Sequence, residues 1–546
     1  MGNAPPPSDP AQEPINLMRG WPNPSLLPAS LIQTAATTAL SDPTIAQPGL
    51  LYGPDEGYEP CRSAIAAWLT TFYRPSPGPI PATRICMTGG ASQNLGCMLS
   101  TFSDPAYTRN VWIVAPAYML AFRVFEQDAG FAGRLRAVPE DEEGIDIAYL
   151  RAEMGKSERQ AVGEQGVVEE EGPRYKPSRP WAKVYKHVVY CVPTFANPSS
   201  RTMSLRRRRE LVRLAREYDA LVVADDVYDF LQWPAKKPGG HSAPSGGEEE
   251  AVKTAHLPRL VDVDREIDGG TGRPGADGFG NACSNGSFSK IGGPGLRCGW
   301  VEGSERFAYG VSQTWRITVI HGGFEGLSSV VGRRCKRPSC TTGEVNLTMD
   351  SQPRCVATYL LCPQEILQGF PSTNLYDGSG TTCSGGAPSQ LTSTYMTILL
   401  TSGGLDKHIQ NVLRPAYARR YNKLINAITT HLLPLGFQLP QPDRDIVGGY
   451  FVWLKLPGRM TATALASACK REGVVIAPGT IFEVPGDRET AGFDGHMRLC
   501  FAWEDEGKLE EGVVRVAGVA REMQGATGDS DGSLQVPDGV DMAGFK

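Results

Sequence analysis

The stretch SLRRRRELVRLAREYDALVVADDVY, residues 204–228, contains one complete unit of the pattern on which the fold depends. Its first part, residues 204–219, places apolar residues at helical spacing among charged ones, which predicts an amphipathic helix. Its second part, ALVVA (220–224), is an unbroken apolar run, typical of a strand buried on both faces of a parallel sheet. Two aspartates, Asp225 and Asp226, end the run. The stretch therefore predicts a helix followed by a buried strand that ends in polar side chains.

Three further segments repeat such a strand along the first part of the chain. Each begins with a short apolar run and ends in or near glycine, proline or asparagine: RICMTGGASQNLGCML (84–99), NVWIVAPAYMLAF (110–122) and KHVVYCVPTFANPSS (186–200). Apolar runs that alternate with helical patterns predict an α/β fold with a mainly parallel sheet sandwiched by helices. Ligands of such sheets bind beyond the carboxyl ends of the strands, where these polar residues lie.

The C-terminal part of the chain has a different pattern. Strongly helical text is followed by GGYFVWLKL (448–456) and HMRLCFAW (496–503), which indicate strands of a smaller α+β domain. We therefore expect a disordered tail (1–14), an N-terminal arm (15–50), a large domain (51–405), a small C-terminal domain (406–523) and a second disordered tail (524–546).

Three stretches interrupt the pattern of the large domain. Residues 155–178 and 234–282 are polar and rich in glycine and proline, so we interpret them as surface excursions. Residues 314–380 show no sustained period of 2 or 3.6. Two hypotheses for this atypical insertion stay open: a genuine loop, or a retained intron translated in frame. Sequencing of the mature transcript across codons 310–385 distinguishes them, because a single continuous exon excludes the intron. The spacing of its cysteines is unlike that of a zinc site, so we predict no metal there: Cys335, Cys340, Cys355 and Cys362.

The composition excludes several classes of function. The 546 residues carry a formal net charge of −5, which provides no electrostatic basis for binding nucleic acid or an anionic membrane. No apolar run approaches the roughly 18 residues of a membrane span. The opening MGNAPPPSDPAQEP lacks the basic and apolar regions of a secretory signal. We expect a soluble, cytoplasmic protein whose cysteines are mostly reduced.

Polar residues that suit a cofactor follow the predicted strands. Asp225 can hold a ring nitrogen protonated, and Tyr228, three residues on, can bond a ring hydroxyl. Asn197 ends another strand, and the turn TGGASQNLGC (88–97) opens a helix whose N-terminus can bind an anion. Taken singly, each has an ordinary interpretation: Asp225 caps the next helix, Asn197 forms a turn, and the glycine-rich segment is a loop.

The stretch SFSKIGGPGLRCGW (287–300) adds two cations to this set. Its glycine- and proline-rich turn would fold Lys290 and Arg297 onto one site. A lysine near another cation and out of bulk water has a lowered pKa and becomes a usable amine nucleophile, and arginine binds phosphate bidentately. The ordinary interpretation is two solvated loop cations. Together with the carboxylate, the phenol, the amide and the anion cradle, however, these cations match the requirements of pyridoxal 5′-phosphate.

With these residues in view, the chain resembles the class I/II aminotransferases, which are fold type I pyridoxal-phosphate-dependent transferases. The similarity runs from INLMRGWPNPSLLP (15–28) to HMRLCFAW (496–503), apart from the three interrupting stretches. It implies a mainly parallel seven-stranded sheet sandwiched by helices, with a smaller α+β C-terminal domain. It also implies that the N-terminal arm packs with the small domain and with a partner subunit.

Residues 287–300 carry the strongest match, to the family signature Ser-x-Ser-Lys…Pro-Gly-x-Arg-x-Gly. The resemblance implies that Lys290 forms a Schiff base with the cofactor and later shuttles a proton. It also implies that Arg297 holds the cofactor phosphate, with Ser287 or Ser289 assisting.

NPSSRTMS, which begins at Asn197, resembles the family's Asn-Pro-Thr-Gly-x-x-x-Ser, so Asn197 is implied to bond the cofactor O3′. Ser200 stands where glycine is usual. This departure bears on the local backbone conformation and not on the role of Asn197. Asp225 and Asp226 both compete for the ring nitrogen. The family's Asp-x-x-Tyr spacing selects Asp225 for that nitrogen and Tyr228 for O3′.

GGASQNL stands where relatives cradle the phosphate, which implies a role for Gly90, Ala91 and Ser92. Ala91 is small where close relatives often carry a serine, so one hydroxyl is missing. The resemblance of APAYMLAF to the family implies that Tyr118 lies over the cofactor ring, as an aromatic residue does in relatives.

MRLCF resembles the segment that binds the substrate, so Arg498 is implied to grip the α-carboxylate. The backbone of Gly20, in RGWP, and the side chain of Asn197 are implied to lie near that carboxylate. Tyr52, in LLYGPDEGY, matches a tyrosine that reaches the phosphate of the partner subunit. The resemblance therefore implies a homodimer with shared active sites.

The implied activity is a transfer of the amino group between an L-amino acid and a 2-oxo acid by a ping-pong Schiff-base mechanism. Three alternatives stay open: a β-lyase or synthase of the same fold, a transcription regulator with an aminotransferase-like domain, and a product inactivated by residues 314–380. The amino donor is not named by the sequence. Two interpretations of Trp21, Tyr118 and Tyr450 stay open: they line room for an apolar or aromatic side chain, or they belong to the core. No second arginine is assigned to a distal carboxylate, so dicarboxylic substrates remain open.

Overall fold

The computed structural model describes residues 14–165, 174–235, 252–314, 388–440 and 445–526. The atypical insertion 314–380 and the two predicted tails lie largely outside these ranges. Within the described part of the chain, every helix is either too short or too polar to span a lipid bilayer.

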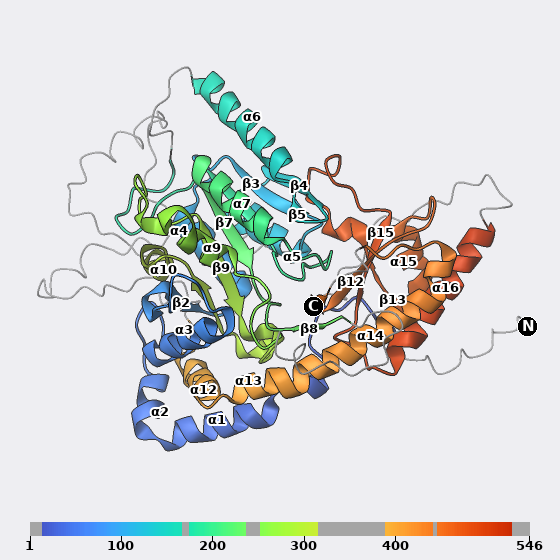
Figure 1. Ribbon diagram of the computed structural model, residues 1–546, viewed down its shortest axis with the longest axis horizontal. Helices are drawn as coiled ribbons and strands as arrows, with labels where there is room; N and C mark the ends of the chain where they lie inside the picture. Colours follow the sequence, from blue (N-terminus) through green and yellow to red (C-terminus); the bar gives the residue numbers. More distant parts are fainter. Residues whose placement is uncertain (1–13, 166–173, 236–251, 315–387, 441–444, 527–546) are drawn as a thin grey trace, which may run out of the picture. The chain divides into compact units, whose positions relative to one another are not determined.

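Eight strands form the central sheet, in the order β2-β10-β9-β7-β6-β3-β4-β5 (Figure 1). Their bounds are Ile85–Thr88 (β2), Asn110–Ala115 (β3), Leu135–Asp141 (β4), Gly144–Ile145 (β5), His187–Cys191 (β6), Ala220–Asp225 (β7), Ala282–Ser287 (β9) and Gly299–Glu302 (β10). β4, β3, β6, β7 and β9 are parallel, whereas β10 is antiparallel to both β2 and β9. The α/β fold with a mainly parallel sheet is confirmed. The resemblance implies seven strands, and the structure has eight, because the two-residue β5 adds a short edge strand beside β4.

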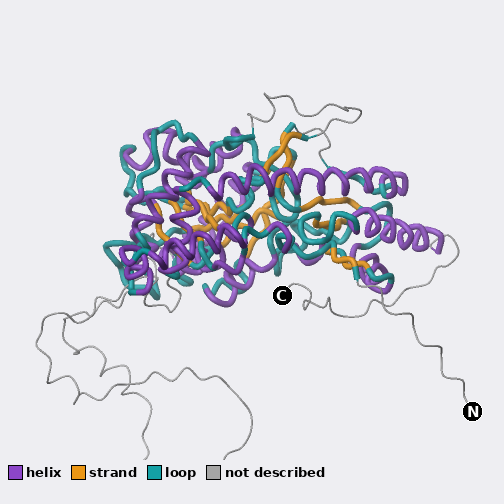
Figure 2. Tube along the Cα trace, turned by 90° about the horizontal axis from the view of Figure 1, so that it is seen from below, coloured by secondary structure: helices purple, strands orange, loops and turns teal. Residues whose placement is uncertain are grey.

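Helices cover both faces of this sheet. Along β7, Leu221 and Val223 pack on one face and Val222 on the other. The first face is covered by α4 (Ala91–Phe102), α5 (Met119–Arg123) and α10 (Glu305–Ser312), and the second by α6 (Ile147–Gln165), α7 (Leu205–Glu217) and α9 (Leu260–Glu266). Figure 2 shows the strands enclosed between helices. Both faces of β7 are therefore buried, which explains why ALVVA is apolar at every position.

Two helices lie in the stretches predicted as surface excursions, and the buried position of α9 corrects that interpretation for its part of 234–282. α6 continues to Gln165, into the stretch 155–178, and α9 lies inside the stretch 234–282. Leu260 and Val263 of α9 pack against the sheet. Prediction fails here because α9 spans only seven residues and the second half of α6 is polar, so neither sustains a helical period.

The C-terminal part of the chain contains a three-stranded sheet in the order β12-β15-β14. Its elements are α14 (Arg414–His431), β12 (Phe451–Lys455), α15 (Ala462–Arg471), β13 (Val474–Val475), β14 (Ala477–Pro478), β15 (His496–Cys500) and α16 (Lys508–Ala526). β11 (Ile446–Gly448) pairs instead with β8 (Gln232–Pro234).

The predicted N-terminal arm divides between two places. Its first residues form β1 (Ile15–Asn16), which pairs in parallel with β13 of the C-terminal part. Its helices α1 (Ala29–Ser41) and α2 (Pro43–Leu50) contact α12 (Gln390–Thr401), which also contacts α3 (Glu59–Tyr73). The short strand thus holds residues just before Gly20 against the C-terminal part.

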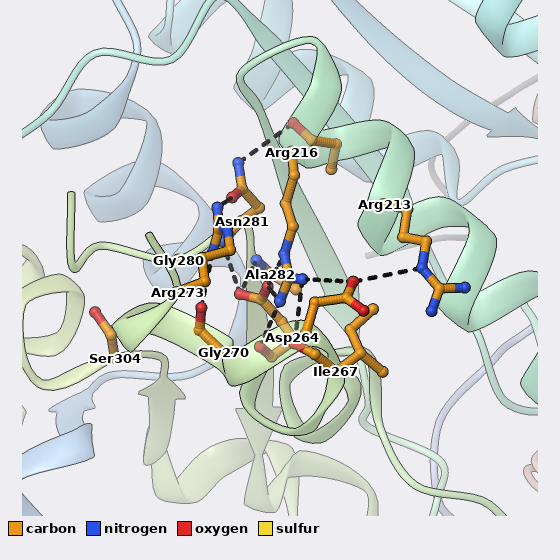
Figure 3. A network of polar contacts seen from close by, with 12 residues as sticks. Arg213, Arg216, Asp264, Ile267, Gly270, Arg273, Gly280, Asn281, Ala282 and Ser304 are labelled. Carbon is orange, nitrogen blue, oxygen red and sulfur yellow. Dashed lines mark hydrogen bonds and ion pairs between the residues drawn. The ribbon is translucent and has the colours of Figure 1, made fainter. Parts of the chain in front are cut away.

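A buried polar network fixes the points at which β7 and β9 begin (Figure 3). Asp264 of α9 accepts a hydrogen bond from the Asn281 backbone N–H at 2.8 Å and pairs with Arg216 at 2.8 Å. The Asn281 side chain donates in turn to the Ala220 carbonyl at 2.9 Å. The carboxylate is almost fully buried and satisfies donors from α7 and from the start of β9. The network therefore sets the register of the two strands whose far ends form the site described below.

Asp264→Ala should lower the free energy of unfolding by about 3–5 kcal/mol, because it removes the buried carboxylate that pairs with Arg216 and accepts from the Asn281 backbone N–H. Of its described ion pairs, Arg216 then keeps only the one with the exposed Asp268. Chemical denaturation measures this change. Arg213→Gln is the matched control, since it removes only the exposed ion pair with Asp268 at 3.4 Å in the same network. Its expected cost is about 0–1 kcal/mol. Equal losses for the two variants would contradict a special role for Asp264.

Candidate active site

Residues that follow β6, β7 and β9 line one pocket together with residues of the N-terminal arm, α4 and β15. Most of the predicted site residues lie in its lining: Gly20, Ala91, Ser92, Tyr118, Asn197, Asp225, Tyr228, Ser287, Ser289, Lys290, Arg297 and Arg498. Two predicted residues do not. Gly90 borders the pocket beside Arg297. Tyr52 is fully exposed and lies outside the pocket of its own chain.

Lys290 is held at the centre of the pocket by backbone and aromatic groups. Its Nζ donates to the Gly20 carbonyl at 2.8 Å and lies 5.7 Å from the centre of the Tyr228 ring. Burial lowers the pKa of Lys290 to about 8, with a smaller contribution in the same direction from Arg498, while the nearby Asp225 opposes the shift. A lysine of this kind has a usable fraction of neutral amine near neutral pH, which makes it a nucleophile.

Asp225 ends β7 with one carboxylate oxygen bound and one free of described partners. The Tyr190 hydroxyl donates to Asp225 Oδ2 at 2.8 Å. Asp225 Oδ1 is buried and accepts no hydrogen bond from any described residue. Burial raises the pKa of Asp225 to about 6, against the opposing effects of Tyr190 and Lys290. A buried carboxylate oxygen requires a donor, and a protonated ring nitrogen is one.

Asp226, the competing carboxylate, is oriented differently. Its Oδ2 accepts a hydrogen bond from the Ser284 hydroxyl at 2.5 Å, and it does not line the pocket. Burial raises the pKa of Asp226 well above its ordinary value. The geometry thus favours Asp225 as the group that faces a ligand.

An anion cradle lies at the N-terminus of α4. A Cβ atom on Gly90 would lie 3.2 Å from Arg297 Nη2 and 3.6 Å from Ser287 Oγ, so these three groups surround one small space. Gly90 has φ 112°, a conformation that favours glycine. Ser289 joins the cradle because the Ser287 and Ser289 hydroxyls lie 2.9 Å apart. Helix N–H groups, hydroxyls and a guanidinium are the donors that bind phosphate.

Arg498 lies on β15 and is almost completely buried. Its Nη1 donates to Asn197 Oδ1 at 2.8 Å, and its Nη2 donates to the Met18 carbonyl. Its guanidinium lies 4.0 Å from the centre of the Phe451 ring, and its Nε has no described hydrogen-bond partner. Burial lowers the pKa of Arg498 to about 10, so the group still carries its charge at neutral pH. A buried, fixed guanidinium of this kind suits a carboxylate.

The chain at Gly20 passes close to the same aromatic ring. A Cβ atom there would lie 2.8 Å from Phe451 Cζ, so a side chain cannot be placed without displacing that ring. The absence of a side chain lets the Gly20 carbonyl approach Lys290.

Ser200 adopts the backbone conformation that glycine favours, with φ 59°. Its hydroxyl donates to the Phe451 carbonyl at 2.6 Å. This hydrogen bond offsets part of the strain of a left-handed serine and ties the Asn197 loop to β12. The departure from the family pattern therefore leaves Asn197 in the pocket.

Two residues support the site in roles that the sequence analysis does not predict. Tyr190, which orients Asp225, lies in the apolar strand HVVYC, where nothing distinguishes it from a core residue. Tyr450 is fully buried outside the pocket lining, and its hydroxyl donates to the Lys290 carbonyl at 2.9 Å. Of the two interpretations left open for Tyr450, the structure favours the core. Trp21 and Tyr118 do line the pocket.

These groups fit pyridoxal 5′-phosphate. The Lys290 amine suits its aldehyde, Asp225 Oδ1 suits its protonated ring nitrogen, and the cradle of Gly90, Ser287 and Arg297 suits its phosphate.

Comparisons with known proteins agree with this assignment. A sequence profile of the family described as aminotransferase class I and II matches residues 23–320. The uncharacterized protein YER152C of Saccharomyces cerevisiae is 28% identical, over 93% of this chain and 97% of its own length. Aromatic-amino-acid aminotransferase 1 of Thermococcus litoralis is 23% identical, over 93% of this chain and 88% of its own. A multiple substrate aminotransferase of Thermococcus profundus has the same fold, with a TM-score of 0.61 at 22% identity, covering 95% of this chain and 93% of the other.

The reactivity of Lys290 should follow its pKa of about 8. Because only the neutral amine attacks an aldehyde, combination of the cofactor-free protein with pyridoxal 5′-phosphate should accelerate about tenfold from pH ~6 to ~7 and level off above pH ~9. Absorbance of the adduct, trapped with borohydride, measures this rate. Lys290→Ala should abolish the trapped adduct. A rate that keeps rising beyond pH ~10 would indicate an ordinary lysine.

Proposed function

The chain belongs to the aminotransferase class I and II family, and we propose how the residues of its pocket divide the reaction between them. It is a pyridoxal-phosphate-dependent transaminase that moves an amino group between an L-amino acid and a 2-oxo acid. One observation carries the proposal: the Lys290 amine, with its lowered pKa, shares a pocket with an Asp225 oxygen that has no described partner.

The cofactor is held by groups from several strand ends. When bound, pyridoxal phosphate supplies a ring that withdraws electrons from the substrate Cα. Asp225 keeps the ring nitrogen protonated, and Arg297 binds the phosphate at the N-terminus of α4. Tyr118 would pack on the ring face, and Asn197 and Tyr228 would hydrogen-bond the ring hydroxyl. Further phosphate contacts come from Gly90, Ala91, Ser92, Ser287 and Ser289.

Four residues hold and deprotonate the substrate. Arg498 clamps the α-carboxylate through its planar fork, and Asn197 orients the guanidinium from the other side. The backbone of Gly20 borders this carboxylate. Lys290 moves the proton at Cα, and its lowered pKa suits it to accept and release that proton near neutral pH.

We further propose a cytoplasmic homodimer in which Tyr52 reaches the partner's phosphate site. Support comes from the end of α2, where Leu50, Leu51 and Tyr52 are exposed next to one another. The cysteines described, all buried and unpaired, fit a reducing compartment. Gel filtration of a soluble cytoplasmic extract should therefore recover the activity at about twice the chain mass of 58.9 kDa. Activity at the mass of one chain would contradict the shared site.

Asp225→Asn should lower kcat for amino transfer by about 10²–10³, because a neutral amide cannot keep the ring nitrogen charged. The assay follows the new amino acid and the new 2-oxo acid together. Release of ammonia and pyruvate instead would favour the β-lyase alternative.

Asp226→Asn is the matched control. Asp226 does not line the pocket, and burial raises its pKa, which favours the neutral form that an amide resembles. Activity should stay within about twofold of the original. Equal losses for the two variants would show that the effect of Asp225→Asn comes from packing and not from the ring nitrogen.

A further inference from the structure

Arg19 lies on a short segment that crosses the pocket. The carbonyl of Met18 accepts from Arg498, and the carbonyl of Gly20 accepts from Lys290 at 2.8 Å. The backbone N–H of Arg19 donates to Asn16 Oδ1 at 2.9 Å. The backbone on both sides of Arg19 is therefore fixed by groups of the proposed active site, and Arg19 itself lines the pocket.

The Arg19 guanidinium is held by aromatic rings and by no described carboxylate. Its central carbon lies 4.9 Å from the Trp21 ring and 4.7 Å from the Trp503 ring, and these two rings meet edge to face at 5.8 Å. The guanidinium makes no ion pair or hydrogen bond with any described residue, and its Nε is buried without a partner. Indole faces attract a cation and orient it, but they do not satisfy its N–H donors.

The charged residues of the pocket show that Arg19 has no assigned anionic partner. Among the described residues that line it, four carry a positive charge and one is a carboxylate: Arg19, Lys290, Arg297, Arg498 and Asp225. In the proposed function, the cofactor phosphate binds Arg297, the ring nitrogen binds Asp225, and the substrate α-carboxylate binds Arg498. Arg19 is then left as a positioned cation facing the same substrate.

We propose that Arg19 binds the side-chain carboxylate of a dicarboxylic substrate, a 2-oxo acid or amino acid with a second carboxylate at its far end. The inference rests on the proposed function, because it requires Arg498 to hold the α-carboxylate. Arginine matches a carboxylate with two parallel N–H donors, and the flanking indoles keep its fork in place without neutralising it. Apolar lining beside it, from Trp21 and Phe451, suits the methylene stem between the two carboxylates.

Paired substrates test this proposal. For the Arg19→Gln holoenzyme, kcat/KM for 2-oxoglutarate should fall about 10–100-fold, because the distal carboxylate loses its partner. For 2-oxohexanoate, which has a neutral tail, kcat/KM should change less than about twofold. For Arg19→Lys, kcat/KM for 2-oxoglutarate should lie between the values of the original protein and of Arg19→Gln, because lysine keeps the charge and loses the planar pair of N–H donors. Equal losses for both substrates would overturn the proposal and leave Arg19 a packing partner of the indoles.

Binding without turnover provides an independent measurement. Calorimetry should show that glutarate binds the holoenzyme and that Arg19→Gln weakens this binding by about the same 10–100-fold. Valerate, with one carboxylate, should bind equally to both proteins. Arg471→Gln, the same change at an exposed site on α15, should leave the affinity for both ligands unchanged.

These measurements separate the two proposals. If no amino transfer occurs with any substrate while glutarate binding depends on Arg19, the proposed function fails and the carboxylate subsite stands. If amino transfer occurs and glutarate binds equally with and without Arg19, the subsite fails and the proposed function stands.

Discussion

Four cations share one pocket with a single carboxylate among its described lining residues. The surrounding structure must therefore hold like charges close together. None of the contacts described for these cations is a close ion pair. Neutral carbonyls, an amide oxygen and aromatic rings hold them: the Gly20 carbonyl for Lys290, the Asn197 amide and the Met18 carbonyl for Arg498, the Pro294 carbonyl for Arg297, and two indoles for Arg19. Burial without neutralisation destabilises the charged forms, which explains the lowered pKa of Lys290 and of Arg498. An anionic ligand relieves this strain, so the pocket is electrostatically prepared for phosphate and carboxylate groups.

The segment that begins at Ile15 connects two parts of the chain through these cations. β1 pairs with β13, and the Leu17 carbonyl accepts from the Cys500 backbone N–H at 2.7 Å, so the segment belongs to the C-terminal part. A few residues later, the Gly20 carbonyl contacts Lys290, which follows β9 of the central sheet. Because the contacts use backbone carbonyls, they place few demands on side chains other than the absence of one at Gly20.

Asp225 and Asp226 show how strand geometry separates two identical side chains. Successive side chains of a strand point to opposite faces. Asp225 faces the pocket and the hydroxyl of Tyr190, whereas Asp226 turns to Ser284. Burial raises the pKa of both groups, and different cations oppose the shift: Lys290 at Asp225, and Arg259 with Arg208 at Asp226. One carboxyl thereby lines the pocket, where it can bind a cationic ring, and its neighbour is buried away from the pocket.

The sequence by itself determined the alternation of buried strands and helices, and with it the α/β fold and most of the pocket residues, because these signals are local. Lys290 and Arg297 stand seven residues apart, and Asp225 and Tyr228 three, so their spacing is visible in a single segment. Only the tertiary structure decided that Tyr190 orients Asp225, that Met18 and Asn197 hold Arg498, and that Arg19 packs between Trp21 and Trp503. Some of these contacts join residues far apart in the sequence, such as Met18 and Arg498, which are 480 positions apart. A tyrosine in an apolar strand also has no sequence feature that predicts its contact with a carboxylate. The physical reason is that the spacing of apolar residues depends only on which face of a segment is buried. Hydrogen bonds and ion–aromatic contacts depend instead on which segments lie next to each other in the folded chain.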